Sequence, residues 1–130
     1  MAERKPFVPK AAKGPEAKIQ LEIIKYLKGL DWYVLVTHGN AYQVGLPDLF
    51  CSHYVYGHRW IDVKNPKSYK FTPAQMEVWP KLCANGSGVW ILIAAKQSEY
   101  DKLFRPANWW SYIQAWLQHE PLNKKETGHE

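Results

Sequence analysis

Two short acidic segments, about fourteen residues apart, constrain the fold more than any other feature of this sequence. The first is Gly-Leu-Pro-Asp, which ends at Asp48, and the second is Asp-Val-Lys, which begins at Asp62. Residues i and i+2 of a β-strand project from the same face. We therefore expect Asp62 and Lys64 to project together from a strand over residues 59–64.

The position of the turn decides whether the two acids meet. Asp48 begins the preceding strand, so it faces Asp62 across an antiparallel hairpin only when the turn centres on Val55. A tight turn at Gly57-His58 would displace Asp48 by about five residues, or roughly 16 Å along the strand. Pairing of the acids therefore predicts a wide loop over residues 54–57.

Two carboxylates held close together repel each other unless a cation binds between them. Two carboxylates about 4 Å apart repel each other by roughly 4 kcal/mol at an effective dielectric constant near 20. Mg²⁺ removes that repulsion because it prefers oxygen ligands. The acids beside the Lys64 ammonium therefore point to a metal-dependent site that cleaves phosphodiesters. In the alternative, Asp48 caps a turn, and Asp62 and Lys64 form a partly buried ion pair on a solvated sheet face.

Two polar residues lie near predicted helix starts. Glu16 precedes the apolar stripe of a helix over 15–28 by three residues, which places it on the core-facing side. It is also a first-turn acid that would complement the helix dipole. Gln75 begins a helix that runs to about residue 85, and Thr72-x-x-Gln75 fits a capping box. Each residue thus has a structural alternative.

The predicted elements alternate between helices and strands. They are helices over 15–28, 72–85, 98–103 and 108–119, a buried strand over 32–37, strands over 49–53 and 59–64, and a central strand over 89–95. This order predicts an α/β fold with a mixed four-stranded sheet flanked by helices. Three strands form a meander, and a crossover helix leads to the fourth. The domain boundaries are a flexible basic arm over 1–14, a single domain over 15–120 and a polar tail over 121–130.

Charge and cysteine content narrow the class of protein. The formal charge is +5 and the pI about 9.2, a modest bias toward polyanions. Two cysteines without repeated spacing favour reduced thiols and a cytoplasmic location. The N-terminus has no apolar segment of a signal peptide, and the longest apolar run is too short to cross a bilayer. We expect no contact with a membrane.

Other residues leave several interpretations open. The Trp-rich helix over 108–119 packs in the core, forms a homodimer surface or, least favoured, stacks on bases. His38, in a polar loop, contacts phosphate or is an ordinary loop histidine. A zinc site from Cys51 and nearby histidines lacks four ligands at structural-site spacing. The basic arm that includes Lys13 contacts phosphates or is a solvated tail.

The two acidic segments, with Glu16 before them and Gln75 after Phe71-Thr72-Pro73, resemble the core of the PD-(D/E)XK nucleases, and in particular their VRR-NUC branch. This branch includes phage endonucleases and resolvase-like enzymes. The resemblance covers roughly residues 15–95. One departure is that Asp62 stands where glutamate is more usual. The resemblance implies a restriction-endonuclease-like core and a DNA endonuclease, with structure-selective or nicking activity within the range of the branch.

The resemblance also implies roles for single residues. Asp48, Asp62 and the Val63 carbonyl would ligate Mg²⁺ or Mn²⁺, and Glu16 would ligate a second metal directly or through water. Lys64 would orient or deprotonate the attacking water and stabilise charge on the phosphate. Gln75 would hold Lys64 or the phosphate.

The expected partner is duplex or branched DNA. The resemblance implies that cleavage leaves 5′-phosphate and 3′-hydroxyl ends. We expect the protein to be a homodimer. If the protein is phage-encoded, it would act in the host cytoplasm. The residues expected to contact DNA are Lys13, His38, Lys67, Tyr69 and Lys70. One rival is a non-catalytic nucleic-acid-binding module on the same fold. A second is an interaction protein that uses its Trp-rich helix.

Overall fold

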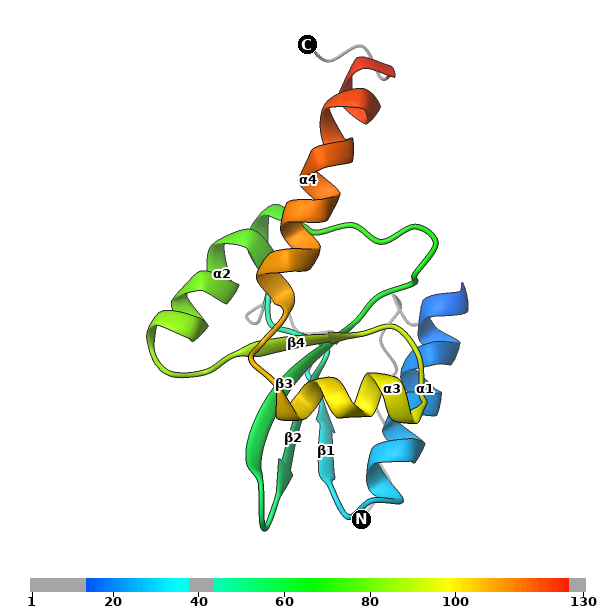
Figure 1. Ribbon diagram of the computed structural model, residues 1–130, viewed down its shortest axis with the longest axis vertical. Coiled ribbons are helices and arrows are strands. Elements are labelled where there is room, and N and C mark those ends of the chain that lie inside the picture. Colours follow the sequence, from blue (N-terminus) through cyan, green and yellow to red (C-terminus); the bar gives the residue numbers. More distant parts are fainter. Residues whose placement is uncertain (1–13, 38–43, 127–130) are drawn as a thin grey trace, which may run out of the picture.

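The computed structural model describes residues 14–37 and 44–126 of the 130-residue chain. The order of elements is α1 (Gly14–Lys28), β1 (Tyr33–Val36), β2 (Leu49–His53), β3 (Gly57–Val63), α2 (Pro73–Ala84), β4 (Val89–Leu92), α3 (Gln97–Tyr100), the 3-10 helix η2 (Asp101–Phe104) and α4 (Trp109–Glu126). Figure 1 shows the sheet between these helices, with α4 projecting away from it.

The four strands form one mixed sheet in the order β1-β2-β3-β4. The first three are antiparallel neighbours, and β4 runs parallel to β3 after the crossover through α2. The predicted α/β fold, with a three-strand meander and a crossover helix, is therefore confirmed at this level.

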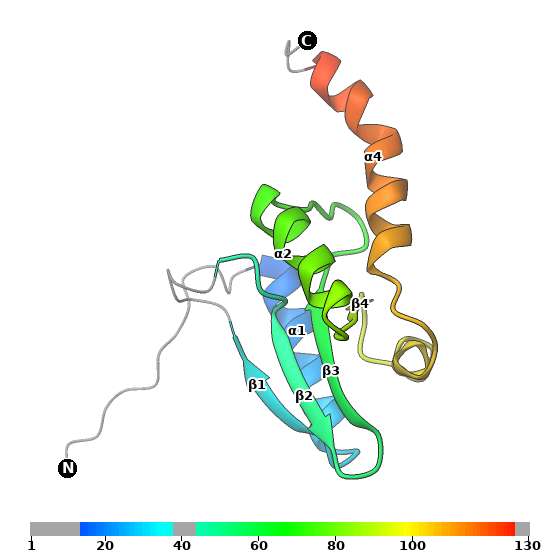
Figure 2. The same ribbon diagram turned by 90° about the vertical axis from the view of Figure 1, so that its left-hand side faces the viewer.

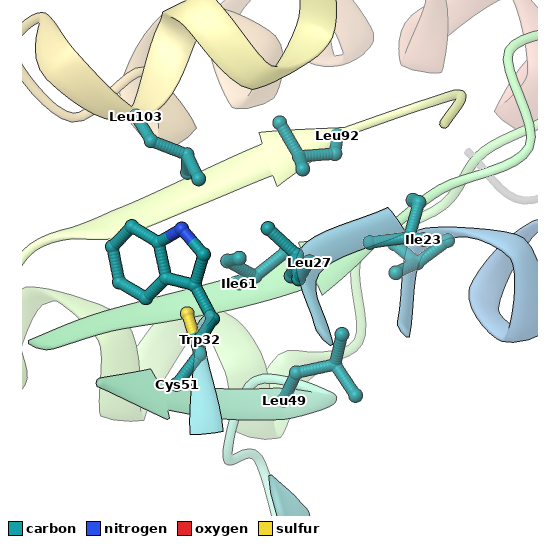
Figure 3. Close-up of a cluster of buried hydrophobic side chains, with 9 residues drawn as sticks. Ile23, Leu27, Trp32, Leu49, Cys51, Ile61, Leu92 and Leu103 are labelled. Carbon is teal, nitrogen blue, oxygen red and sulfur yellow. The ribbon is translucent and has the colours of Figure 1, made fainter. Parts of the chain in front are cut away.

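Each face of the sheet has its own core. One core joins α1 to β2, β3 and β4 through nine buried residues, and Figure 3 shows its side chains converging around Leu27 and Ile61. The other core lies between the opposite face, α2 and α4. Its buried members are Phe71, Trp79, Val89, Ile91 and Ile113. The sheet is thus the middle layer, and successive side chains of a strand enter different cores.

The hairpin between β2 and β3 has the register that the acid pair requires. Leu49 pairs with Ile61 and His53 pairs with Gly57, so the turn covers residues 54–56 and centres on Val55. The predicted centre at Val55 is confirmed and a tight turn at Gly57-His58 is excluded, but the loop is one residue shorter than predicted because Gly57 already pairs with His53.

Two predicted strands occupy other positions in the sheet than expected. The strand expected over 32–37 to be buried is β1, at the edge of the sheet formed by the described strands, and three of its four residues are exposed. The strand expected over 89–95 to be central is β4, at the other edge. It ends at Leu92 because the amide of Ile93 donates to Glu99 Oε1, at 3.0 Å, instead of continuing the ladder.

Helix boundaries also differ from the predictions. Leu30 lies beyond the end of α1 and is 38% exposed, so it is not part of the apolar stripe. The helix expected over 98–103 is split into α3 and η2. The last helix continues through Glu126, past the predicted start of the polar tail at residue 121.

Candidate active site

The ends of β2 and β3 bring the two acids together through backbone hydrogen bonds. The amide of Asp48 donates to Asp62 Oδ1 at 3.2 Å, and the amide of Val63 donates to Asp48 Oδ2 at 2.8 Å. Each carboxylate therefore satisfies a backbone donor next to the other acid. The predicted juxtaposition of Asp48 and Asp62 is present in the structure.

Lys64 follows β3 and turns its ammonium back toward Asp62. The Nζ atom lies 3.1 Å from Asp62 Oδ2, and it donates to the Lys70 carbonyl at 2.7 Å and to Gln75 Oε1 at 3.3 Å. It also lies 4.6 Å from the centre of the Phe71 ring and 5.8 Å from that of Trp79. Aromatic faces and carbonyl oxygens thus replace the water that would otherwise solvate the charge.

The ion pair of Asp62 and Lys64 is buried, which differs from the solvated sheet face considered as an alternative. Asp62 is 0% exposed and Lys64 6%. The Phe71 and Trp79 side chains lie over the ammonium on this face of the sheet. A buried ion pair is weak evidence for a stabilising role, because the loss of hydration offsets much of the attraction.

Gln75 fulfils both of the roles that its position allowed. The Thr72 hydroxyl accepts from the Gln75 amide at 3.1 Å, and Gln75 Oε1 accepts from the Thr72 amide at 3.0 Å, which completes a capping box at the start of α2. The same Oε1 atom accepts from Lys64. The helix cap therefore holds the oxygen that orients the lysine.

Burial is the largest cause of the raised pKa values of the site carboxylates. Burial raises the pKa of Asp48 well above 3.8, and the neighbouring Asp62 raises it further. Burial also raises the pKa of Asp62, although the Lys64 charge opposes this shift. The environment therefore disfavours the charged form of both carboxylates. Such shifted pKa values are typical of sites that bind a cation or exchange protons.

One oxygen of the pair lacks a hydrogen bond. Asp62 Oδ2 is buried and touches the Lys64 ammonium at a distance suited to an ion pair, but no donor among residues 14–37 and 44–126 meets hydrogen-bond geometry. Buried polar atoms usually have a hydrogen-bond partner, and the ammonium contact stands in its place here. A hard cation is one group that would satisfy such an oxygen.

Glu16 lies in the first turn of α1, close enough to Lys64 and Asp62 for their charges to act on its carboxylate. Its side chain is exposed, and it is the least sheltered of the three acids. Partial burial raises its pKa, and the charges of Lys64 and Asp62 both act on it. The first turn of α1 therefore supplies an acid at the margin of the site rather than inside it.

The carboxylates fit a hard divalent cation in their chemistry, with Asp48 and Asp62 as the inner pair. In the part of the chain that the structure describes, no group of three or more His, Cys, Asp and Glu residues is close enough to form a complete metal site. The Val63 carbonyl, waters and a phosphate oxygen would have to complete an octahedral shell, which suits Mg²⁺ because it retains several waters.

The residues predicted to contact DNA differ in their exposure to solvent. Lys67 and Lys70 are exposed in the loop after Lys64. Tyr69 instead packs edge-on against Phe71 and Tyr112, with ring centres 5.7 and 5.8 Å apart, so it belongs mainly to the core. Lys13 and His38 lie outside the described residues.

The residues considered for zinc have other partners. Cys51 is buried and its Sγ donates to the Arg59 carbonyl at 3.6 Å. His53 Nδ1 accepts from the Val55 amide at 3.0 Å. His58 stacks on Phe50 on the opposite face of the sheet, with ring centres 5.6 Å apart.

Sequence reasoning missed Trp79, and it singled out Gly45 only as part of the Gly-Leu-Pro-Asp segment. The Trp79 indole donates to the Gly45 carbonyl at 2.9 Å and so anchors α2 to the segment that leads to Asp48. A Cβ atom at Gly45 would lie 2.7 Å from the Ala74 carbonyl oxygen, and the φ angle there is +90°. The spacing of Gln75 and Trp79, one helical turn apart, was a usable signal, because it places both on the side of α2 that faces Lys64.

Comparisons with known proteins assign no family. No protein-family model matches the sequence, and searches of curated proteins and of solved structures give no significant match. Among the described helices, none combines the length and apolar character needed to span a membrane. The site is therefore interpreted from its geometry.

Proposed function

We propose that the protein is a metal-dependent DNA endonuclease of the PD-(D/E)XK type, with a restriction-endonuclease-like core. The observation that carries this proposal is the meeting of Asp48, Asp62 and Lys64 at the ends of adjacent strands, with a buried Asp62 oxygen that lacks a hydrogen bond. The proposal also draws on the VRR-NUC-like order of Glu16, the two acidic segments and Gln75.

The acids would hold Mg²⁺ or Mn²⁺ between Asp48 and Asp62, with the Val63 carbonyl as a backbone ligand. When bound, the metal ion would polarise a phosphate oxygen and lower the pKa of a coordinated water. Glu16 would bind from the exposed side, directly or through water.

Lys64 is the group suited to meet the negative charge that builds on the phosphate. Its ammonium is already stripped of most of its hydration, so it needs little reorganisation to stabilise an anion. Gln75 keeps the ammonium oriented through the capping box of α2. Exposed Lys67 and Lys70 follow directly in the chain and suit the flanking phosphates.

Replacement of Asp48 by Asn tests this proposal with little risk to the fold. The amide oxygen of asparagine can still accept from Val63, whereas the metal loses an anionic ligand. We expect Asp48→Asn to abolish Mg²⁺-dependent DNA cleavage and to retain the wild-type circular dichroism spectrum. Asp31→Asn is the matched control, because Asp31 is exposed and its positive φ of 73° also suits asparagine. Full cleavage by Asp48→Asn would refute the proposal.

A non-catalytic nucleic-acid-binding module is the second candidate. The observation in its favour is that the Lys64 ammonium already occupies the space beside Asp62 Oδ2, which makes a closed ion pair. Titration calorimetry separates the two candidates. The nuclease binds Mn²⁺ at millimolar concentration and Asp48→Asn does not, whereas the binding module shows no heat of Mn²⁺ binding in either protein.

A further inference from the structure

Part of one sheet face has none of the described helices over it. Figure 2 shows α1 behind the sheet and α2 in front of the upper ends of β2 and β3, while the lower parts of β1, β2 and β3 face the viewer uncovered. The side chains on this open part form a patch of mostly aromatic residues. We call it the sheet patch; its members are Tyr33, Leu35, Phe50, His58 and Trp60.

The strand registers arrange the sheet patch in two rows. Tyr33 pairs with Ser52, which pairs with His58, and this is the outer row. Leu35, Phe50 and Trp60 form the inner row in the same way. All of these side chains share a face, because residues two apart on a strand project from the same side.

Three rings of the patch contact one another, and the Tyr33, Leu35 and His58 side chains are exposed. Phe50 lies 4.9 Å from Trp60 and 5.6 Å from His58, measured between ring centres, and it stacks on the histidine. Tyr33 is 64% exposed and Leu35 44%. Exposed apolar side chains gathered in this way usually mark a binding surface.

The next row of the same face is the acid pair. The Thr37 amide donates to the Asp48 carbonyl at 2.9 Å, so the pairing of β1 and β2 continues to Asp48, and Asp62 follows Trp60 by two residues. Adjacent rows are about 7 Å apart along a strand, which is comparable to one nucleotide of an extended polynucleotide. Lys67 and Lys70 follow Lys64 beyond the acids. The basic loop, the acids and the sheet patch therefore succeed one another along β3.

We propose that the sheet patch binds unpaired nucleobases of the strand whose phosphate reaches the acid pair, so that the substrate contains single-stranded DNA next to the cut. This inference rests on the proposed nuclease function and names its substrate class. Bases in a duplex present their faces to one another, whereas unpaired bases offer a face that stacks on aromatic side chains. The continuity of the patch with the acids and the net charge of +5 favour a nucleic-acid strand over a protein partner.

Binding measured in EDTA tests the patch independently of cleavage. The probes are a fluorescein-labelled oligothymidylate of about 20 nucleotides, the same length of abasic sugar-phosphate strand, and a duplex of that length. Base stacking contributes about 1–3 kcal/mol per base, or roughly fivefold to 150-fold in Kd. We expect Tyr33→Ser and His58→Ala each to raise the Kd for oligothymidylate by at least about fivefold, and to leave the Kd for the duplex within about twofold.

The abasic strand and one variant serve as controls. Wild-type protein should bind the abasic strand as weakly as the two variants bind oligothymidylate. Tyr54→Ser removes a tyrosine that is 87% exposed at the hairpin turn, outside the patch, and should bind all probes like wild type. Equal wild-type affinities for oligothymidylate and the abasic strand, or unaffected binding by both variants, would overturn the inference.

Three further outcomes show which of the two proposals fails. If the protein cuts DNA in Mg²⁺ but the patch variants bind and cut single-stranded and branched substrates like wild type, the patch inference fails and the nuclease proposal stands. If Tyr33→Ser instead abolishes a dimer seen by sedimentation and leaves binding of oligothymidylate unchanged, the patch belongs to a second copy of the chain, which also overturns the inference. Absence of cleavage with any substrate, despite base-dependent binding, counts against the nuclease alone.

Discussion

At the scale of single residues, the acid pair should lower the stability of the folded protein. Burial and the charge of Asp62 raise the pKa of Asp48 above 3.8, so the folded protein binds this proton more tightly than the unfolded chain does. The free energy of unfolding therefore falls as the pH rises above 3.8. We expect Asp48→Asn to raise the free energy of unfolding at pH 7 in EDTA by on the order of 1 kcal/mol, or several degrees in Tm.

Thermal unfolding with and without Mn²⁺ checks this prediction. Mn²⁺ should raise the Tm of the wild-type protein, and the rise should grow with the Mn²⁺ concentration. It should leave the Tm of Asp48→Asn unchanged. Asp31→Asn should melt like wild type, because Asp31 is exposed. A lower Tm for Asp48→Asn in EDTA would show that the two carboxylates are not in conflict.

The two cysteines should differ in reactivity. Burial raises the pKa of Cys51 to about 12, so its thiolate is scarce at pH 8, whereas Cys83 is partly exposed. We expect a thiol reagent to modify Cys83 in the native protein and both cysteines in denaturant. Rapid modification of Cys51 under native conditions, located by mass spectrometry, would contradict the packing of β2.

At the scale of elements, the contact of α2 with the segment before Asp48 positions the site. A Cβ atom at Gly45 would lie 2.7 Å from the Ala74 carbonyl oxygen and 2.9 Å from Val78 Cγ2, so Gly45→Ala must displace α2. Gly86 also has a positive φ, +95°, but its Cβ would have nothing within 4 Å. We expect Gly86→Ala to lower the free energy of unfolding by about 1–2 kcal/mol through backbone strain alone. Gly45→Ala should lower it by about 1–3 kcal/mol more, because of the steric overlap. Gly45→Ala should also lose most of the cleavage rate. Equal stability of the two variants in urea would contradict the close contact.

The capping box of α2 allows its structural and catalytic roles to be separated. Thr72→Ala removes the hydroxyl that caps the helix, at a cost of about 1 kcal/mol, but it leaves the backbone amide that holds Gln75. Gln75→Ala removes an acceptor of Lys64 as well. We expect the rate per folded molecule to fall only in Gln75→Ala. Equal rates in the two variants would show that Gln75 only caps α2 and does not contribute to cleavage.

The sequence predicted most of the elements because local patterns specify them. The spacing of Asp62 and Lys64 placed both on one face of a strand, but the hairpin register followed only on the condition that Asp48 faces Asp62. The edge positions of β1 and β4 were not predictable, because an apolar run such as Val89–Leu92 reads the same at an edge as in the centre of a sheet. The aromatic enclosure of Lys64 depends on Phe71 and Trp79, whose approach is set by tertiary packing rather than by spacing.

At the scale of the whole molecule, α4 is the helix through which we expect a homodimer to form. Its inner side packs on the core through Ile113 and neighbouring rings, whereas Trp110 is 51% exposed and Leu117 39% exposed, seven residues further along the helix. We expect a dimer in sedimentation velocity that the double variant Trp110→Ser, Leu117→Ser dissociates. A wild-type monomer at all concentrations would refute this expectation.

The central claim is that the acid pair and Lys64 cut DNA with a divalent metal, and a cleavage panel tests it most directly. Single-stranded, duplex and branched DNA are incubated with Mg²⁺, Mn²⁺ or EDTA. The account predicts that wild-type protein cuts at least one substrate with metal and none in EDTA, leaving 5′-phosphate ends. Folded Lys64→Ala should be at least about 100-fold slower, and Lys81→Ala, an exposed lysine on α2, should match wild type. Failure to cut any substrate with either metal, or undiminished cleavage by Lys64→Ala, would contradict the account.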